Sequence, residues 1–84
     1  MGKYELLKHY FMEKNDLKLV LTMEKIEEIM DASLPKSAYK YAQWWNNSKT
    51  KAHPYSRAWT EVGYYTVGVN DTIFNKKIVF EKNR

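Results

Sequence analysis

The part of the chain that decides the expected fold is residues 22–46, with the sequence TMEKIEEIMDASLPKSAYKYAQWWN. Apolar residues recur at three- and four-residue spacings from Met23 to Met30, which is the periodicity of a helix with one buried face. Thr22 is a natural N-cap for this helix, because its hydroxyl can accept a backbone N–H. Residues 31–35 predict a tight connection, since Pro35 disfavours helix before it and suits the start of a new helix. The stretch therefore predicts two helices joined by a short turn.

We expect the second of these helices to run from about Pro35 to Asn46. Its inward face carries Ala38, Ala42 and Trp45. The outward face carries cations, hydroxyls and an amide: Lys36, Ser37, Tyr39, Lys40 and Gln43. Trp44 points about 100° away from Trp45 on a helix, so the two rings cannot both occupy the centre of the core. Trp44 either caps the core, which we favour, or offers a surface for stacking a base.

Working outward, the flanking segments complete the order of elements. A helix is predicted over residues 4–14 and a short strand over residues 17–21, from helical and alternating apolar patterns respectively. A short helix is expected over residues 55–62, followed by strands over residues 64–70 and 76–82 that form an antiparallel hairpin with an irregular tip. This order is typical of a winged helix-turn-helix domain, an α+β fold in which the first strand joins the hairpin and the hairpin tip is the wing. A different α+β packing of the same elements is the alternative.

The composition indicates one small folded domain over residues 1–84. Hydrophobic residues make up 44% of the chain and aromatic residues 15%, and there is no cysteine. Disulfides and thiolate metal sites are therefore excluded, and buried aromatic rings are expected to supply the core. No apolar stretch approaches the roughly 20 residues that cross a bilayer. The N-terminal segment carries charges where a signal peptide needs an apolar core, so we expect a cytoplasmic protein.

The inventory of chemically active side chains predicts binding without catalysis. His9 and His53 are far apart, and neither belongs to a spaced metal motif. The sequence contains no glycine-rich phosphate loop and no nucleophile elbow. We therefore expect no enzymatic activity, no metal, no cofactor and no small-molecule ligand.

The positive charge is segregated along the chain. The net charge is +4 overall, but residues 1–31 carry −2, residues 32–60 carry +5 with no acid, and residues 61–84 carry +1. A concentrated block of cations is typical of a surface that binds a polyanion such as DNA. The alternative interpretation is an ordinary solvated face of lysines.

The candidate DNA contacts come from the second predicted helix, the basic loop after it, the next short helix and the hairpin tip. Lysine and arginine would neutralise phosphates, the Ser, Tyr and Gln side chains of the helix would read bases, and the tip would touch the backbone or minor groove. The full set is Lys36, Ser37, Tyr39, Lys40, Gln43, Lys49, Lys51, Arg57, Asn75, Lys76 and Lys77. Base readout is expected from the helix rather than from the tip. His53 either contacts phosphate or anchors its loop.

Several motifs carry a resemblance to known families. Leu34-Pro35-x-Ser37-Ala38 and Trp44-Trp45-x-Asn47, with His53, Ala58-Trp59 and Gly63-Tyr64 further on, resemble a family of small, largely uncharacterised bacterial winged-helix domains. The size, layout and Lys/Asn/Ile-rich composition are also similar to TcpK-like winged-helix accessory proteins of clostridial conjugative plasmids. That second resemblance implies a DNA-binding role at an origin of transfer.

Together these patterns predict a double-stranded DNA-binding protein that acts as a transcriptional regulator or as an accessory factor at a plasmid or phage DNA site. Because one small domain buries a modest interface, a homodimer or paired copies on DNA are expected. The alternative is a protein-interaction module whose basic face docks on an acidic partner, since a fold does not dictate a function.

Overall fold

The computed structural model describes residues 2–47 and 54–82. Within them, the helices are α1 (Lys3–Met12), α2 (Met23–Met30), α3 (Lys36–Lys40), α4 (Arg57–Thr60) and α5 (Thr72–Asn75), and the strands are β1 (Lys18–Thr22), β2 (Tyr64–Val67) and β3 (Lys77–Lys82). Three 3-10 turns complete the described elements: η1 (Ala42–Trp45), η2 (Pro54–Ser56) and η3 (Val69–Asp71). The domain therefore belongs to the α+β class.

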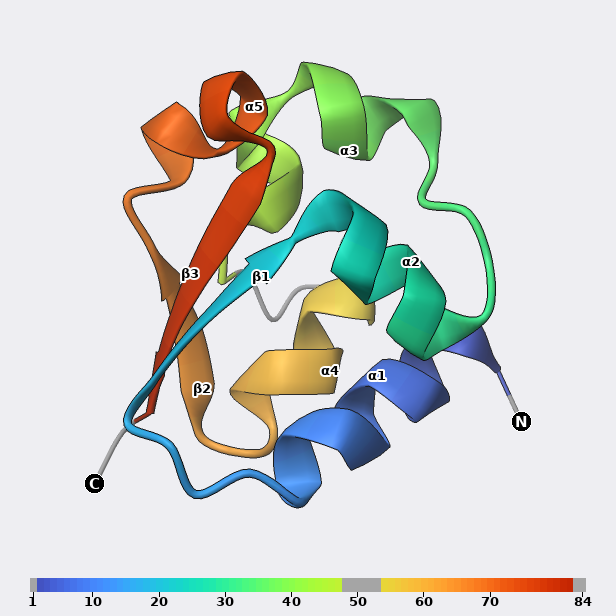
Figure 1. The fold of residues 1–84 in the computed structure, drawn as a ribbon, viewed down its shortest axis with the longest axis vertical. Helices are drawn as coiled ribbons and strands as arrows, with labels where there is room; N and C mark the ends of the chain where they lie inside the picture. The colour runs from blue at the N-terminus through green and yellow to red at the C-terminus, as the bar shows by residue number, and fades with distance from the viewer. Residues whose placement is uncertain (1, 48–53, 83–84) are drawn as a thin grey trace.

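The three strands form one antiparallel sheet in the order β1-β3-β2. Thr22 of β1 pairs with Lys77 of β3, and Tyr64 of β2 pairs with Lys82. The predicted antiparallel hairpin is thus confirmed, and the first strand joins it as expected. Figure 1 shows the sheet on the left, α1, α2 and α4 on its right, and α3 and α5 together at the top.

The core lies between the sheet and the helices and is largely aromatic, as the composition predicted. Rings follow one another through the domain, from Phe11 to Phe80 with centroids 4.7 Å apart, from Phe80 to Trp59 at 5.5 Å, and from Trp59 to Trp45 at 6.1 Å. Each of these four side chains is at most 1% exposed. Aromatic pairs at such separations add attraction beyond the area that they bury.

The two helices predicted on either side of residues 31–35 are both present, but the second is shorter than predicted. The Thr22 hydroxyl caps α2 by accepting the N–H of Lys25 at 2.9 Å, which confirms the predicted N-cap. A single helix over residues 35–46, however, is wrong: α3 ends at Lys40, Tyr41 is extended, and η1 follows. Pro35 is the N-cap of α3 rather than its first helical residue.

The two tryptophans explain the break. The indole N–H of Trp45 donates to the Ala38 carbonyl at 2.9 Å, a carbonyl that would accept a backbone N–H from Ala42 in a continuous helix. With the helix broken, both adjacent rings enter the core: Trp45 is 0% exposed and Trp44 is 7% exposed. Burying two large rings side by side offsets the loss of a regular helix.

The connection between β2 and β3 is folded rather than extended. It contains η3 and α5, which pack against η1 and α3. Lys76 ends α5 in the left-handed conformation, with φ of 55°. The hairpin tip is irregular, as expected, and it is part of the body of the domain.

Candidate functional site

A hollow at the top of the molecule joins the two regions that the sequence proposed as DNA contacts. It has a volume of about 480 Å³, lies between α2, α3 and α5, and is lined by Thr22, Met23, Glu24, Glu27, Tyr39, Asn75 and Lys76. Tyr39 from α3 therefore lies close to Asn75 and Lys76 from the hairpin tip. Residues that are far apart in the sequence meet at one end of the fold.

We call the exposed side chains around this hollow the polar end. Its members come from α3, η1, α5 and the residues next to them: Lys36, Ser37, Tyr39, Lys40, Tyr41, Gln43, Phe74, Asn75 and Lys76. Every candidate contact that the sequence placed on the outward face of the helix is exposed here, in spite of the break at Tyr41. Lys77 follows directly and is also exposed, on the outer face of the sheet opposite Thr22.

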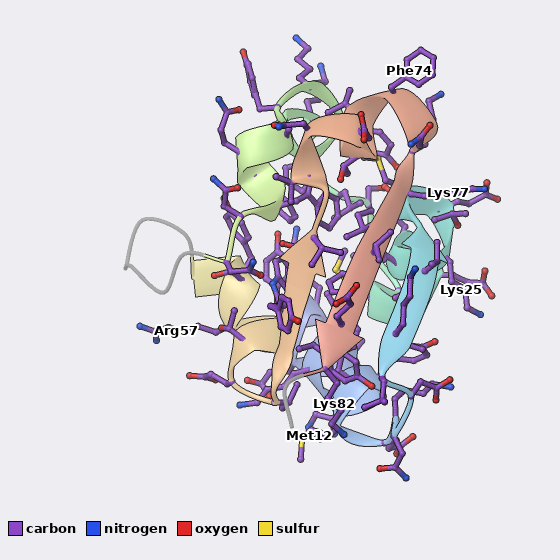
Figure 2. The ribbon with its side chains drawn as sticks, turned by 90° about the vertical axis from the view of Figure 1, so that its left-hand side faces the viewer. Met12, Lys25, Arg57, Phe74, Lys77 and Lys82 are labelled. Atoms are coloured by element: carbon purple, nitrogen blue, oxygen red, sulfur yellow. The ribbon has the colours of Figure 1, made fainter. Side chains whose placement is uncertain are left out.

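Other candidate contacts are not part of this group. Arg57 is exposed on α4 and borders a separate hollow beside the first turn of α1, with Tyr4 and Lys8. Figure 2 shows Arg57 and Lys77 pointing to opposite sides of the domain. Lys49, Lys51 and His53 lie outside the residues that the structure describes.

The polar end is bordered by acids on its α2 side. Burial raises the pKa of the Tyr39 phenol, and a hydrogen bond to Glu27 and the negative charges of Glu27 and Glu24 raise it further. The Glu27 carboxylate also accepts the backbone N–H of Leu34 at 2.7 Å, so it fixes the connection between α2 and α3. Glu28 and Asp31 continue this acidic border. An anionic partner would therefore approach α3 and α5 from the side away from α2.

Two exposed aromatic rings of the polar end were not among the predicted contacts. Tyr41 is 58% exposed and Phe74 is 91% exposed. Tyr41 is the extended residue at the break between α3 and η1. The signal for Phe74 was present in the sequence: an aromatic residue in a hairpin tip has no partner strand to cover it.

Trp44 serves the core rather than the surface. Its ring stacks on Tyr55 with centroids 4.0 Å apart and planes 4° from parallel, and it also contacts Tyr4 and Trp45. The preferred prediction that Trp44 caps the core is confirmed. Little of its surface remains for a base.

Asn47, the last residue of the Trp44-Trp45-x-Asn47 motif, has a structural role. Its side-chain oxygen accepts the Trp59 indole N–H at 3.0 Å and the Thr66 backbone N–H at 2.7 Å, and its amide donates to the Thr66 carbonyl at 3.0 Å. The Thr66 hydroxyl donates to the Trp45 carbonyl at 2.6 Å. The Trp44-Trp45-x-Asn47 motif thus joins η1, α4 and β2, which gives it a role in specifying the fold.

Within residues 2–47 and 54–82, no group of three or more His, Cys, Asp or Glu side chains is placed to hold a metal ion. The helices of the same ranges are also too short or too polar for any of them to span a bilayer.

The fold and this site define a small α+β domain with an exposed polar end whose charged members are lysines. Over residues 4–82 the chain matches the family described as Domain of unknown function (DUF7662), and it belongs to that family. The match agrees with the predicted membership of a small domain family, whereas the winged-helix motif assignment and the similarity to TcpK-like proteins stay predictions. Neither a curated protein nor a solved structure matches the chain.

Proposed function

We propose that the protein binds double-stranded DNA through the polar end and performs no catalysis. The observation that carries this proposal is the meeting of α3 with the hairpin tip around one hollow. It places the exposed Lys36 and Lys40 at the same end of the fold as Lys76 and Lys77. Clustered lysines on one end are suited to neutralising phosphates. The release of counterions from the neutralised phosphates supplies most of the affinity for nonspecific DNA.

The roles of the polar groups follow from their placement. Ser37 and Gln43 would face base edges while the lysines contact the backbone, in a winged-helix arrangement with α2 and α3 as the helix pair and the β2–β3 connection as the wing. The Tyr39 hydroxyl is bonded to Glu27, so Tyr39 would contribute its ring as an apolar contact to a base. The five residues of α3 span only about 7.5 Å, against about 18 Å for the twelve-residue helix first predicted. A helix this short offers few base contacts, so phosphate contacts would dominate binding.

The biological setting of this proposal comes from the resemblance described above. A regulator, or an accessory factor at a plasmid or phage site such as an origin of transfer, needs binding and no chemistry. Two copies on neighbouring half-sites would supply the interface area that one domain lacks.

A salt titration of duplex binding, read by fluorescence anisotropy, tests the proposal. Four engaged lysines predict a slope of about −3.6 in log K against log salt, because each phosphate contributes about −0.9 on B-DNA. The double variant Lys36→Gln/Lys40→Gln should reduce the slope to about −1.8. The matched control is Lys3→Gln/Lys25→Gln, which removes the same charge from α1 and α2 and should leave the slope unchanged.

Two results would contradict the proposal. No duplex binding at about 50 mM salt would favour the alternative, an acidic protein partner for the same lysines. Equal loss of affinity in the two double variants would show that net charge matters and the polar end does not.

A further inference from the structure

Phe74 is the most exposed large hydrophobic side chain of the described residues. Its ring is 91% exposed, although its neighbours in α5 point inward: Thr72 is 2% exposed and Ile73 packs against the core. Figure 2 shows the ring projecting from the top of the domain, beyond the ribbon. Burying a phenylalanine side chain is worth about 1.5 to 3 kcal/mol, so the free domain forgoes a substantial gain that a partner could recover.

The turn that carries Phe74 is held firmly in place. The Lys76 backbone N–H donates to the Thr72 carbonyl at 2.8 Å, and the Lys76 carbonyl accepts the N–H of Met23 at 3.0 Å. The second bond ties the tip to the first residue of α2. A ring on a turn fixed in this way loses little backbone freedom when it is inserted into a partner.

The charges around Phe74 select the kind of partner. Asn75, Lys76 and Lys77 follow it directly and are all exposed, and Lys36 and Lys40 lie on the adjacent α3. Asp71 is the one acid of the connection, and it faces the outer side of the sheet beside Val67 and Lys77. Glu24 and Glu27 of α2 line the hollow on the other side of Asn75 and Lys76, so an anionic partner would meet the tip from the side away from α2. An apolar ring followed by amide and ammonium groups fits an anionic surface that also offers an apolar gap, which is what an unstacked base step provides.

We propose that Phe74 is a wedge that enters the minor groove and partly unstacks one base step, with Lys76 and Lys77 on the flanking phosphates. This inference rests on the proposed DNA binding and adds a specific mode to it. Apolar wedges of this kind kink a duplex by about 20 to 90°. Because pyrimidine–purine steps unstack most easily, the wedge would give the protein a preference for such steps without hydrogen bonds to bases. That selectivity compensates for the few contacts that the short α3 can make.

The test uses the full chain and a short duplex with 2-aminopurine beside a central TA step and a fluorophore pair at its ends. Binding should raise 2-aminopurine fluorescence and shorten the end-to-end distance. Phe74→Ala should abolish both signals, weaken binding to this duplex about tenfold, as expected for loss of one stacked ring, and leave the salt slope unchanged. Phe74→Trp should restore both signals. Met12→Ala removes a side chain that is 59% exposed at the opposite end of the domain (Figure 2), and it should retain both signals.

The possible failures are distinguishable. If the protein binds duplex with the expected salt slope but without an increase in 2-aminopurine fluorescence, the wedge is wrong and DNA binding stands. The wedge is equally overturned if Phe74→Ala still bends the duplex. If the unmodified protein does not bind duplex at all, the proposed function itself fails and the wedge fails with it.

Discussion

Asn47 connects three separate segments of the chain through one side-chain amide. It receives the Trp59 indole N–H and both accepts from and donates to the Thr66 backbone. Asn47→Ala would leave these groups without partners, at about 1 to 3 kcal/mol for each one that stays buried. We therefore expect the urea midpoint to fall sharply. The exposed Asn46 is the control: Asn46→Ala should change stability by less than about 0.5 kcal/mol, and equal midpoints for the two variants would refute the structural role of Asn47.

Tyr64 should make the stability of the domain fall as the pH rises in the alkaline range. Burial raises the pKa of its phenol, the charges of Asp16 and Tyr10 raise it further, and its O–H donates to the Asp16 carbonyl at 2.7 Å. In the unfolded chain the Tyr64 phenol has a pKa near 10, which is lower than its pKa in the folded protein. The stabilisation is therefore complete below about pH 10 and is lost as the pH rises through the raised folded value. Urea midpoints measured from pH 8 to pH 11 should fall less steeply for Tyr64→Phe than for the unmodified protein, and parallel curves would contradict the assignment.

Single residues with a simple local role could be predicted from the sequence. The capping role of Thr22 follows from the residue type and its position before an apolar stripe, and the burial of Ala38 follows from helical spacing. The role of Asn47 could not be predicted, because its partners lie 12 and 19 positions further along the chain. Periodicity reports only neighbours along one element.

At the scale of elements, the largest difference from prediction is the break after α3. Helical spacing treats Trp44 and Trp45 as points about 100° apart on one cylinder, and so allows only one of them in the core. The chain instead changes direction at Tyr41 and buries both rings, with the Trp45 indole bonded to the Ala38 carbonyl. The strands were predicted more accurately than this helix, because their pairing follows from the alternation of apolar residues and from the hairpin that joins two of them. A side chain that replaces a backbone hydrogen bond leaves no signal in the periodicity.

The end of α2 offers a stability prediction for an element boundary. Asp31 ends the helix in the left-handed conformation, with φ of 53°. Glycine adopts this conformation without a steric penalty, and removing an acid from a helix C-terminus is also favourable. Asp31→Gly should therefore stabilise the domain by about 1 kcal/mol. Ser33→Gly, at a position of negative φ in the same connection, should destabilise it because glycine only loosens the unfolded chain there. Urea unfolding of the two variants measures these changes in stability. If both variants are destabilised, the left-handed conformation is not costly at Asp31.

At the scale of the whole molecule, the distribution of charge in space differs from its distribution along the chain. Residues 32–60 hold a net charge of +5, which predicted a surface that binds a polyanion. The fold divides that block: α3 turns its lysines to the polar end, while Arg57 on α4 lies beside α1 and points to another side (Figure 2). In exchange, the fold brings Lys76 from the last third of the chain to α3. Charge segregation along the chain pointed to residues 32–60 alone. Lys76 was among the predicted contacts only because it lies in the predicted hairpin tip.

This division of the charge yields a prediction that compares two single substitutions. Arg57→Gln and Lys76→Gln each remove one positive charge, so any effect of net charge on DNA affinity is the same for both. Only Lys76 belongs to the polar end, so only Lys76→Gln should reduce the salt slope, by about 0.9 for one lost phosphate contact. Arg57→Gln should shift affinity slightly and leave the slope at the unmodified value. If Arg57→Gln reduces the slope and Lys76→Gln does not, DNA lies along α4 and α1, and the polar end must be reassigned as a surface for another partner.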